Sequence, residues 1–215
     1  MPTATFFRLP EEKRKRLMDA CWAEVIRVRF SEVSINRIIV AAHIPRGSFY
    51  QYFEDKEDLI RYLLEDMRQY FITLLRDILV EAKGDLFALP LAAYDRFIGR
   101  QGRADPMLTV FIRIVTLNKG IDMQSFMGGP PSFLPDALWE VVDPSKLRCG
   151  DRDYADQVFH LACAVLAFAV VETLECLERP DRTPDPVRTA RVRELTKVRM
   201  DLLRYGGASY KEETA

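Results

Sequence analysis

The chain of 215 residues has few of the side chains from which enzyme and metal sites are built. It contains only two histidines, His43 and His160, and its four cysteines show no C-x-x-C or Cys/His metal spacing. It also lacks a glycine-rich phosphate loop, a nucleophile elbow and an H-E-x-x-H motif. We therefore expect no enzyme activity, no cofactor and no bound metal ion.

Long apolar segments are also scarce. The N-terminus is polar and basic after Phe7, without the apolar stretch of a secretory signal. The longest apolar run, residues 161–171, is about half as long as a membrane-spanning helix. We expect a cytoplasmic protein with reduced thiols that does not enter a membrane.

The net charge of −1 is unevenly distributed. Between Arg8 and Phe53 the chain has nine Lys or Arg residues and five Asp or Glu residues, a local excess of four positive charges. This asymmetry is typical of a nucleic-acid-binding region attached to an acidic body. A solvated surface would account for the same excess equally well.

Residues 34–56 have the pattern of two short helices joined by a tight turn. Ser34 is a suitable N-cap, and apolar residues follow it at helical spacing: Ile35, Ile38, Ile39 and Ala42. Pro45 lacks a backbone donor and biases Ile44 away from the helical region, so the chain must turn there.

The second helix of this pair, residues 46–53, is short and has two different sides. Phe49 and Phe53, four residues apart, can anchor one side. The other residues are left for solvent or a partner: Arg46, Gly47, Ser48, Tyr50, Gln51 and Tyr52. This layout favours a helix-turn-helix whose second helix enters the major groove of DNA.

At these positions the chain resembles the TetR (tetracycline-repressor) family of bacterial transcription regulators. The matching elements are Ile38-x-x-Ala41-Ala42, Arg46-Gly47-Ser48-Phe49-Tyr50-x-Tyr52-Phe53, Lys56 and Leu59. The resemblance covers about the first 60 residues, and beyond them it extends only to length and helical character. It implies an all-α fold, with a helix-turn-helix DNA-binding domain at residues 1–55 and a helical ligand-binding and dimerisation domain at residues 56–215.

Three residues depart from the family pattern. His43 stands where glycine usually provides a positive φ, and Pro45 stands where Ser or Thr usually caps the recognition helix. Arg29 replaces a common glycine. None of these changes removes a group expected to face DNA.

The resemblance and the expected geometry together assign roles to the DNA-binding residues. Tyr50, Tyr52 and Lys56 are expected to contact phosphates. Arg46, Ser48 and Gln51 lie nearer the base edges, and Gly47 lets the backbone approach the DNA closely. Ser34 and Arg37 complete the predicted set.

Periodicity and capping residues predict further helices along the chain. We expect them at residues 10–30, 56–83, 85–100, 154–177 and 187–205 and from Asp105 onward, with mixed helical structure at residues 133–142 and a loop at residues 128–131. Residues 161–171 are apolar on every side, so that helix must be covered all round. A second copy of the chain could cover its outer face, and we expect a homodimer through the last two helices.

Aromatic residues spread over the second domain either fill an ordinary core or line an apolar pocket. The candidates for a ligand site are Phe97, Phe111, Arg113, Asn118, Trp139, Phe159, His160 and Cys163. Among them, His160 stands in an apolar helix, where most histidines are hydrogen-bonded core residues, and Cys163 lacks the basic neighbours that would lower its pKa.

These features together predict a homodimeric repressor that leaves a palindromic operator when a small apolar or aromatic effector binds. Two alternatives stay open. One is a DNA-binding regulator of the same fold that responds to no small molecule, and the other is a helical module for protein–protein interaction.

Overall fold

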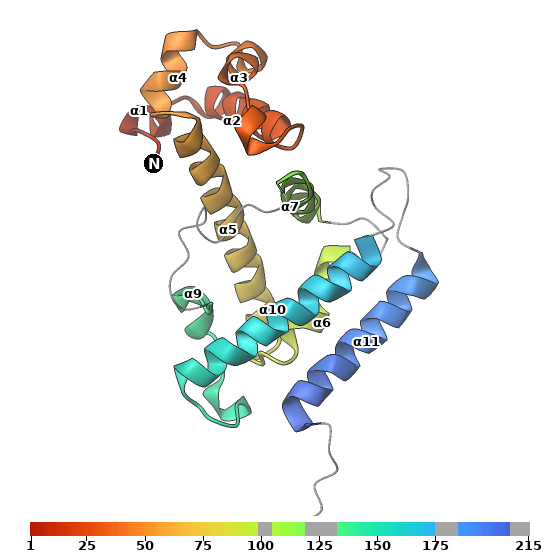
Figure 1. The fold of residues 1–215 in the computed structure, drawn as a ribbon. Coiled ribbons are helices and arrows are strands. Elements are labelled where there is room, and N and C mark those ends of the chain that lie inside the picture. The colour runs from red at the N-terminus through yellow and green to blue at the C-terminus, as the bar shows by residue number, and fades with distance from the viewer. Residues whose placement is uncertain (99–104, 119–132, 175–184, 207–215) are drawn as a thin grey trace, which may run out of the picture. The chain divides into compact units, whose positions relative to one another are not determined.

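The computed structural model describes residues 1–98, 105–118, 133–174 and 185–206. Every regular element in these ranges is a helix, as predicted (Figure 1). The chain forms two compact units. The N-terminal unit comprises Met1–Tyr70 and Pro106–Gly129, and the C-terminal unit comprises Phe71–Asp105 and Pro130–Ala215. The functional division at residues 1–55 and 56–215 stays a prediction, since compactness does not assign a function to either part.

The N-terminal unit is built from short helices around the start of one long helix. Its elements are α1 (Ala4–Phe7), α2 (Glu11–Val25), the 3-10 turn η1 (Phe30–Glu32), α3 (Ile35–Ala42), α4 (Arg46–Tyr52), the first part of α5 (Lys56–Glu81) and α7 (Pro106–Leu117). The first long helix ends at Val25, earlier than the predicted residue 30. Arg29 is extended there, and η1 then places Phe30 in the core, where it is 3% exposed.

Helix α1 was not predicted, although it supplies a central core residue. Phe6 is fully buried, and its ring lies 5.2 Å from that of Phe53 and 5.3 Å from that of Tyr62. These rings join the N-terminus of the chain to the end of α4 and the second turn of α5. The end of α4 therefore packs against an aromatic cluster that includes Phe6, Phe53 and Tyr62.

Helix α5 begins and ends close to the predicted residues. Asp55 accepts a hydrogen bond from the backbone N–H of Asp58 at 2.7 Å, as expected of an N-cap. At the other end Lys83 and Gly84 both have positive φ. A Cβ on Gly84 would lie 2.4 Å from the backbone nitrogen of Asp143, so the close packing of these two chain segments requires glycine.

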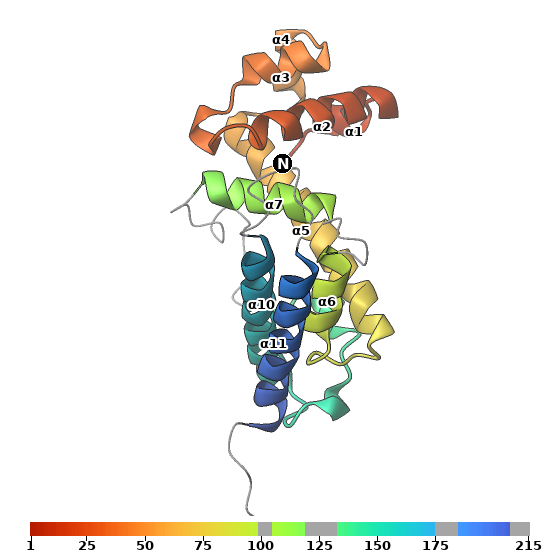
Figure 2. The same ribbon diagram turned by 90° about the vertical axis from the view of Figure 1, so that its right-hand side faces the viewer.

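In the C-terminal unit three helices lie side by side: α6 (Leu89–Ile98), α10 (Arg152–Leu174) and α11 (Pro186–Tyr205) (Figure 2). The Tyr94 hydroxyl, from α6, lies 2.7 Å from that of Thr173 on α10, in the buried centre of the unit. Asp95 and Arg193 pair through two contacts of 2.8 and 2.9 Å and join α6 to α11. These three helices therefore share one core and are tied together by polar contacts.

The other predictions for the C-terminal unit were met in part. The mixed helical structure expected at residues 133–142 is the single turn α9 (Asp136–Trp139), and the 3-10 turn η2 (Pro144–Lys146) follows it. Pro135 precedes α9 with extended backbone, which confines the helix to the residues after it. The predicted loop at residues 128–131 lies outside the described residues.

Helix α10 is more hydrophobic over its full length than the run at residues 161–171 suggested. Its residues 152–173 form a segment long and apolar enough to cross a membrane, with a mean hydropathy of 1.7. The same length and composition are found in core helices of globular domains. Here α10 packs against α6 and α11, and 33% of its most apolar stretch is buried within the chain.

Candidate DNA-binding interface

The connection between α3 and α4 has the predicted geometry of a helix-turn-helix. Ser34 caps α3 by accepting a bond from the backbone N–H of Arg37 at 3.4 Å. His43 ends α3 in the left-handed region, with φ 53° and ψ 47°, where the resemblance implied a positive φ. Pro45 stands before α4 and gives no side-chain cap, also as predicted.

Helix α4 has one buried and one open side. Phe49 and Phe53 are fully buried. The open side presents Arg46, Gly47, Tyr50 and Gln51, with Ser48 half-buried beside them. A Cβ on Gly47 would meet no atom within 4 Å, so the fold itself does not require glycine there.

Tyr52 does not face solvent, and this part of the prediction was wrong. Its side chain is only 8% exposed, and its ring packs edge-on against Phe6 at 6.4 Å. Tyr52 lies three residues after Phe49 and therefore shares the buried side of α4. Helix α1, which the sequence did not reveal, covers it.

Lys56 begins α5, as predicted, at the edge of the same surface. Its ammonium group donates to the backbone carbonyl of Ser31 at 3.0 Å and is half-buried. Because the acceptor is a neutral carbonyl, the positive charge of Lys56 stays available to an anion. The contact also holds the side chain next to η1.

Glu24 joins α2 to the start of α3 and was missed in the sequence. Its carboxylate is buried, accepts two bonds from Arg27 at 2.8 and 2.9 Å, and accepts one from the backbone N–H of Ser34 at 3.1 Å. Burial alone would raise the pKa of Glu24, but the hydrogen bonds from Arg27 and Ser34 outweigh it and hold the pKa below its usual value. The spacing of Glu24 and Arg27 was the only local signal for this contact.

Arg113 and Asn118 were expected to orient a ligand, but the structure gives them other partners. Asn118 is buried, accepts from the backbone N–H of Phe30 at 2.9 Å and donates to Ile114 at 2.8 Å. Arg113 is exposed and donates to the backbone carbonyl of Ile26 at 3.1 Å. Both side chains fasten α7 to η1 and to the end of α2, so they belong to the scaffold of the N-terminal unit.

The remaining ligand candidates are distributed over both units. Phe111 is on α7 in the N-terminal unit, whereas Phe97, Trp139, Phe159, His160 and Cys163 belong to the C-terminal unit. Phe97 and Phe159 are buried, and Trp139 is half-buried. A ligand-lining role for these residues stays a prediction.

His160 and Cys163 lie on α10 in unlike surroundings. His160 is exposed, so its interpretation as a core residue was wrong, and its ring stacks on that of Phe133 at 3.9 Å. Burial raises the pKa of the Cys163 thiol to about 12. A thiol with that pKa is protonated at neutral pH and is a poor nucleophile.

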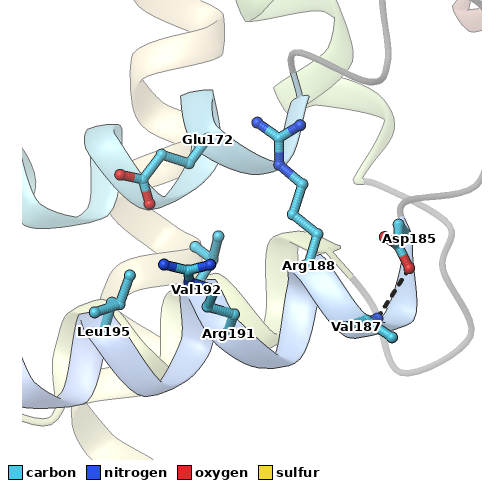
Figure 3. A pocket seen from close by; sticks show the side chains of 7 residues that line it. All are labelled: Glu172, Asp185, Val187, Arg188, Arg191, Val192 and Leu195. Atoms are coloured by element: carbon cyan, nitrogen blue, oxygen red, sulfur yellow. Dashed lines mark hydrogen bonds between the residues drawn. The ribbon is translucent and has the colours of Figure 1, made fainter.

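Two cavities of the C-terminal unit are lined by other residues. One, of about 480 Å³, lies at the start of α11 and is lined by Glu172, Asp185, Val187, Arg188, Arg191, Val192 and Leu195 (Figure 3). The other, of about 340 Å³, lies between α6 and α11 beside the Asp95–Arg193 pair. Neither contains a residue that was predicted to bind a ligand.

The helix-turn-helix residues match known regulators in sequence. Residues 17–63 match the sequence model of bacterial regulatory proteins of the tetR family. The transcriptional regulator AcuR from Cereibacter sphaeroides is 44% identical over 46 residues. That alignment covers 21% of this chain and 21% of AcuR, so the chain matches about a fifth of the length of this relative.

Solved structures resemble the chain over nearly its whole length. A TetR family transcriptional regulator from Chloroflexus aurantiacus is 26% identical, with a TM-score of 0.51 over 96% of this chain and 98% of the other. A transcriptional regulator from Pseudomonas aeruginosa has a TM-score of 0.58 at 18% identity, over 94% and 96% of the two chains. FadR from Bacillus subtilis, solved with stearoyl-CoA, has a TM-score of 0.54 at 16% identity, over 90% of this chain and 99% of the FadR chain. At these identities the last two share the fold alone.

The contact made by Glu24 predicts a pH dependence of stability. Because the folded state lowers the pKa of Glu24, the stabilisation is complete above the unfolded-state pKa and is lost as pH falls through the folded-state pKa. Between about pH 5 and pH 3 we expect the melting temperature of the wild type to fall more steeply than that of Glu24→Gln. Glu11→Gln, which removes an exposed charge, should keep the wild-type slope. Equal slopes for Glu24→Gln and the wild type would contradict the assignment.

Proposed function

Because the chain belongs to the TetR family of bacterial regulatory proteins, and is thus a DNA-binding transcriptional regulator, we propose that it acts as a homodimeric repressor. In this proposal a small apolar or aromatic effector releases the dimer from an inverted-repeat operator. The location would be the cytoplasm, where a regulator reaches bacterial DNA.

The observation that carries the proposal is the open side of α4. Arg46 and Gln51 are exposed on a helix that the buried Phe49 and Phe53 fix to the core. A helix anchored in this way can present its polar side to base edges in a major groove. Gly47 supports the same orientation, because the fold leaves space there and a close approach to DNA explains the glycine.

The surrounding residues suit contacts with the DNA backbone. Tyr50 is exposed beside the base-reading residues, and Lys56 lies in the first turn of α5. Ser34 and Arg37 lie at the start of α3, where the positive end of the helix dipole favours an anion. We propose that these residues hold phosphates while Arg46, Ser48 and Gln51 read the sequence.

Exposed apolar residues on α10 and α11 support the dimer. On α10, Leu161, Phe168 and Val171 are 49%, 64% and 58% exposed. On α11 the exposed apolar residues are Val187, Leu195, Val198, Leu202 and Tyr205. Within each helix most of these residues are three, four or seven positions apart, the spacing of helices packed in a bundle. The same two helices of a second copy would cover both stripes.

The proposed effector would bind within the C-terminal unit. The resemblance in fold to FadR, which was solved with stearoyl-CoA, is consistent with an apolar effector. The alternative is a regulator of the same fold without an effector, and it predicts that no such compound raises the melting temperature. A module that binds only proteins would not explain the exposed Arg46, Tyr50 and Gln51.

Substitutions at the interface should separate backbone contacts from base contacts. Lys56→Ala should weaken binding to all duplexes alike and reduce the slope of log affinity against log salt by about one per half-site. Gln51→Ala should cost about 1–3 kcal/mol on a duplex selected by the wild-type protein and scarcely affect random DNA. Lys197→Ala, which removes an exposed cation from α11, is the matched control for charge. The assignment fails if Lys56→Ala changes sequence preference and leaves the salt slope intact.

The dimer has its own test. Phe168→Glu would place a charge in the centre of the proposed contact, so we expect monomers or aggregates in sedimentation at micromolar protein. Val80→Glu, at an exposed apolar residue on α5, should sediment as the wild type does. A wild-type chain that sediments as a monomer would contradict the proposed assembly.

A further inference from the structure

Helix α4 is too short to be held by its own hydrogen bonds. It has seven residues, and the chain continues from it in extended conformation at Phe53. The last carbonyl groups of a helix have no partner within it, and a helix of two turns is not stable alone. No side chain caps its first turn either, because Pro45 occupies that position. The far end of α4 therefore needs donors from elsewhere.

Thr3 supplies two such donors. Its backbone N–H donates to the carbonyl of Tyr52 at 3.0 Å, and its hydroxyl donates to the carbonyl of Gln51 at 2.5 Å. Thr3 is thus a C-terminal cap for α4, contributed by a segment 48 positions away. One of the two carbonyls belongs to Gln51, whose side chain is proposed to read a base.

Phe6 fixes the same segment against the core. Its fully buried ring touches Tyr52 from α4, Phe53 directly after it, and Tyr62 from α5. A movement of Phe6 would leave a hole beneath α4, and core cavities of this kind are costly. Thr3 therefore holds the end of α4, and Phe6 holds Thr3 in place.

We propose that the segment from Thr3 to Phe6 positions the recognition helix and so determines the sequence specificity of the protein without touching DNA. The matched family region begins at residue 17 and does not include this segment. The inference rests on the proposed base-reading role of α4. Base-edge contacts carry the sequence information, whereas phosphate contacts are the same on every duplex. Loss of the cap therefore affects selected DNA more than random DNA.

Thr3→Pro tests the cap directly. Thr3 has a φ of −74°, which proline also adopts, so the substitution removes both donors without straining the backbone. The control is Thr3→Ser, which keeps both donors. The probes are a duplex selected by the wild-type protein from random-sequence DNA, and poly(dI-dC).

For Thr3→Pro we expect affinity for the selected duplex to fall about fivefold to twentyfold, as the loss of two hydrogen bonds implies. Affinity for poly(dI-dC) and the salt slope should stay within about twofold of the wild type. Thr3→Ser should match the wild type on both probes. Phe6→Ala should reproduce the effect of Thr3→Pro, whereas Val80→Ala, at a residue of α5 that is 53% exposed, should not.

Two results would overturn the proposal. One is unchanged affinity of Thr3→Pro for the selected duplex. The other is an equal loss on both probes together with a lower melting temperature, which would mean that the segment only stabilises the unit. Amide exchange gives a readout without DNA, because residues 49–53 should exchange faster in Thr3→Pro than in Thr3→Ser while α10 stays unchanged. If the wild type selects no duplex, the proposed base-reading role of α4 is wrong. The exchange result still decides whether Thr3 anchors α4.

Discussion

The burial of Phe49 and Phe53 is the contact on which the DNA-binding surface depends. Both rings are fully buried, and together they determine which side of a seven-residue helix faces outward. Among the residues proposed to meet bases, Gln51 lies opposite this side and Arg46 is exposed in the first turn, so this core sets their direction. Tyr52 lies on the same anchored side of α4, which explains why its side chain does not face solvent.

Local features of the N-terminal unit could be predicted because neighbouring residues decide them. Ser34 and Asp55 cap the helices that follow them, and His43 takes the left-handed conformation at the turn. In each case the side chain acts on backbone groups within a few residues. The pattern of Phe49 and Phe53 likewise predicted the anchored side of α4.

Contacts between distant segments could not be predicted in this way. Asn118 lies 88 positions from Phe30, and nothing in either sequence neighbourhood indicates their hydrogen bond. Phe6 stands in a segment with little helical pattern, although it completes the aromatic core. The residues of a ligand site could not be predicted either, because aromatic composition alone does not distinguish the lining of a pocket from an ordinary core.

The central claim is that two copies of α4 read DNA together, and a hydroxyl-radical footprint on a selected duplex tests it most directly. Two α4 helices related by a two-fold axis enter major grooves one or more helical turns apart. We therefore expect two protected patches, equal in extent and related by the symmetry of an inverted repeat. A single asymmetric patch would contradict the account.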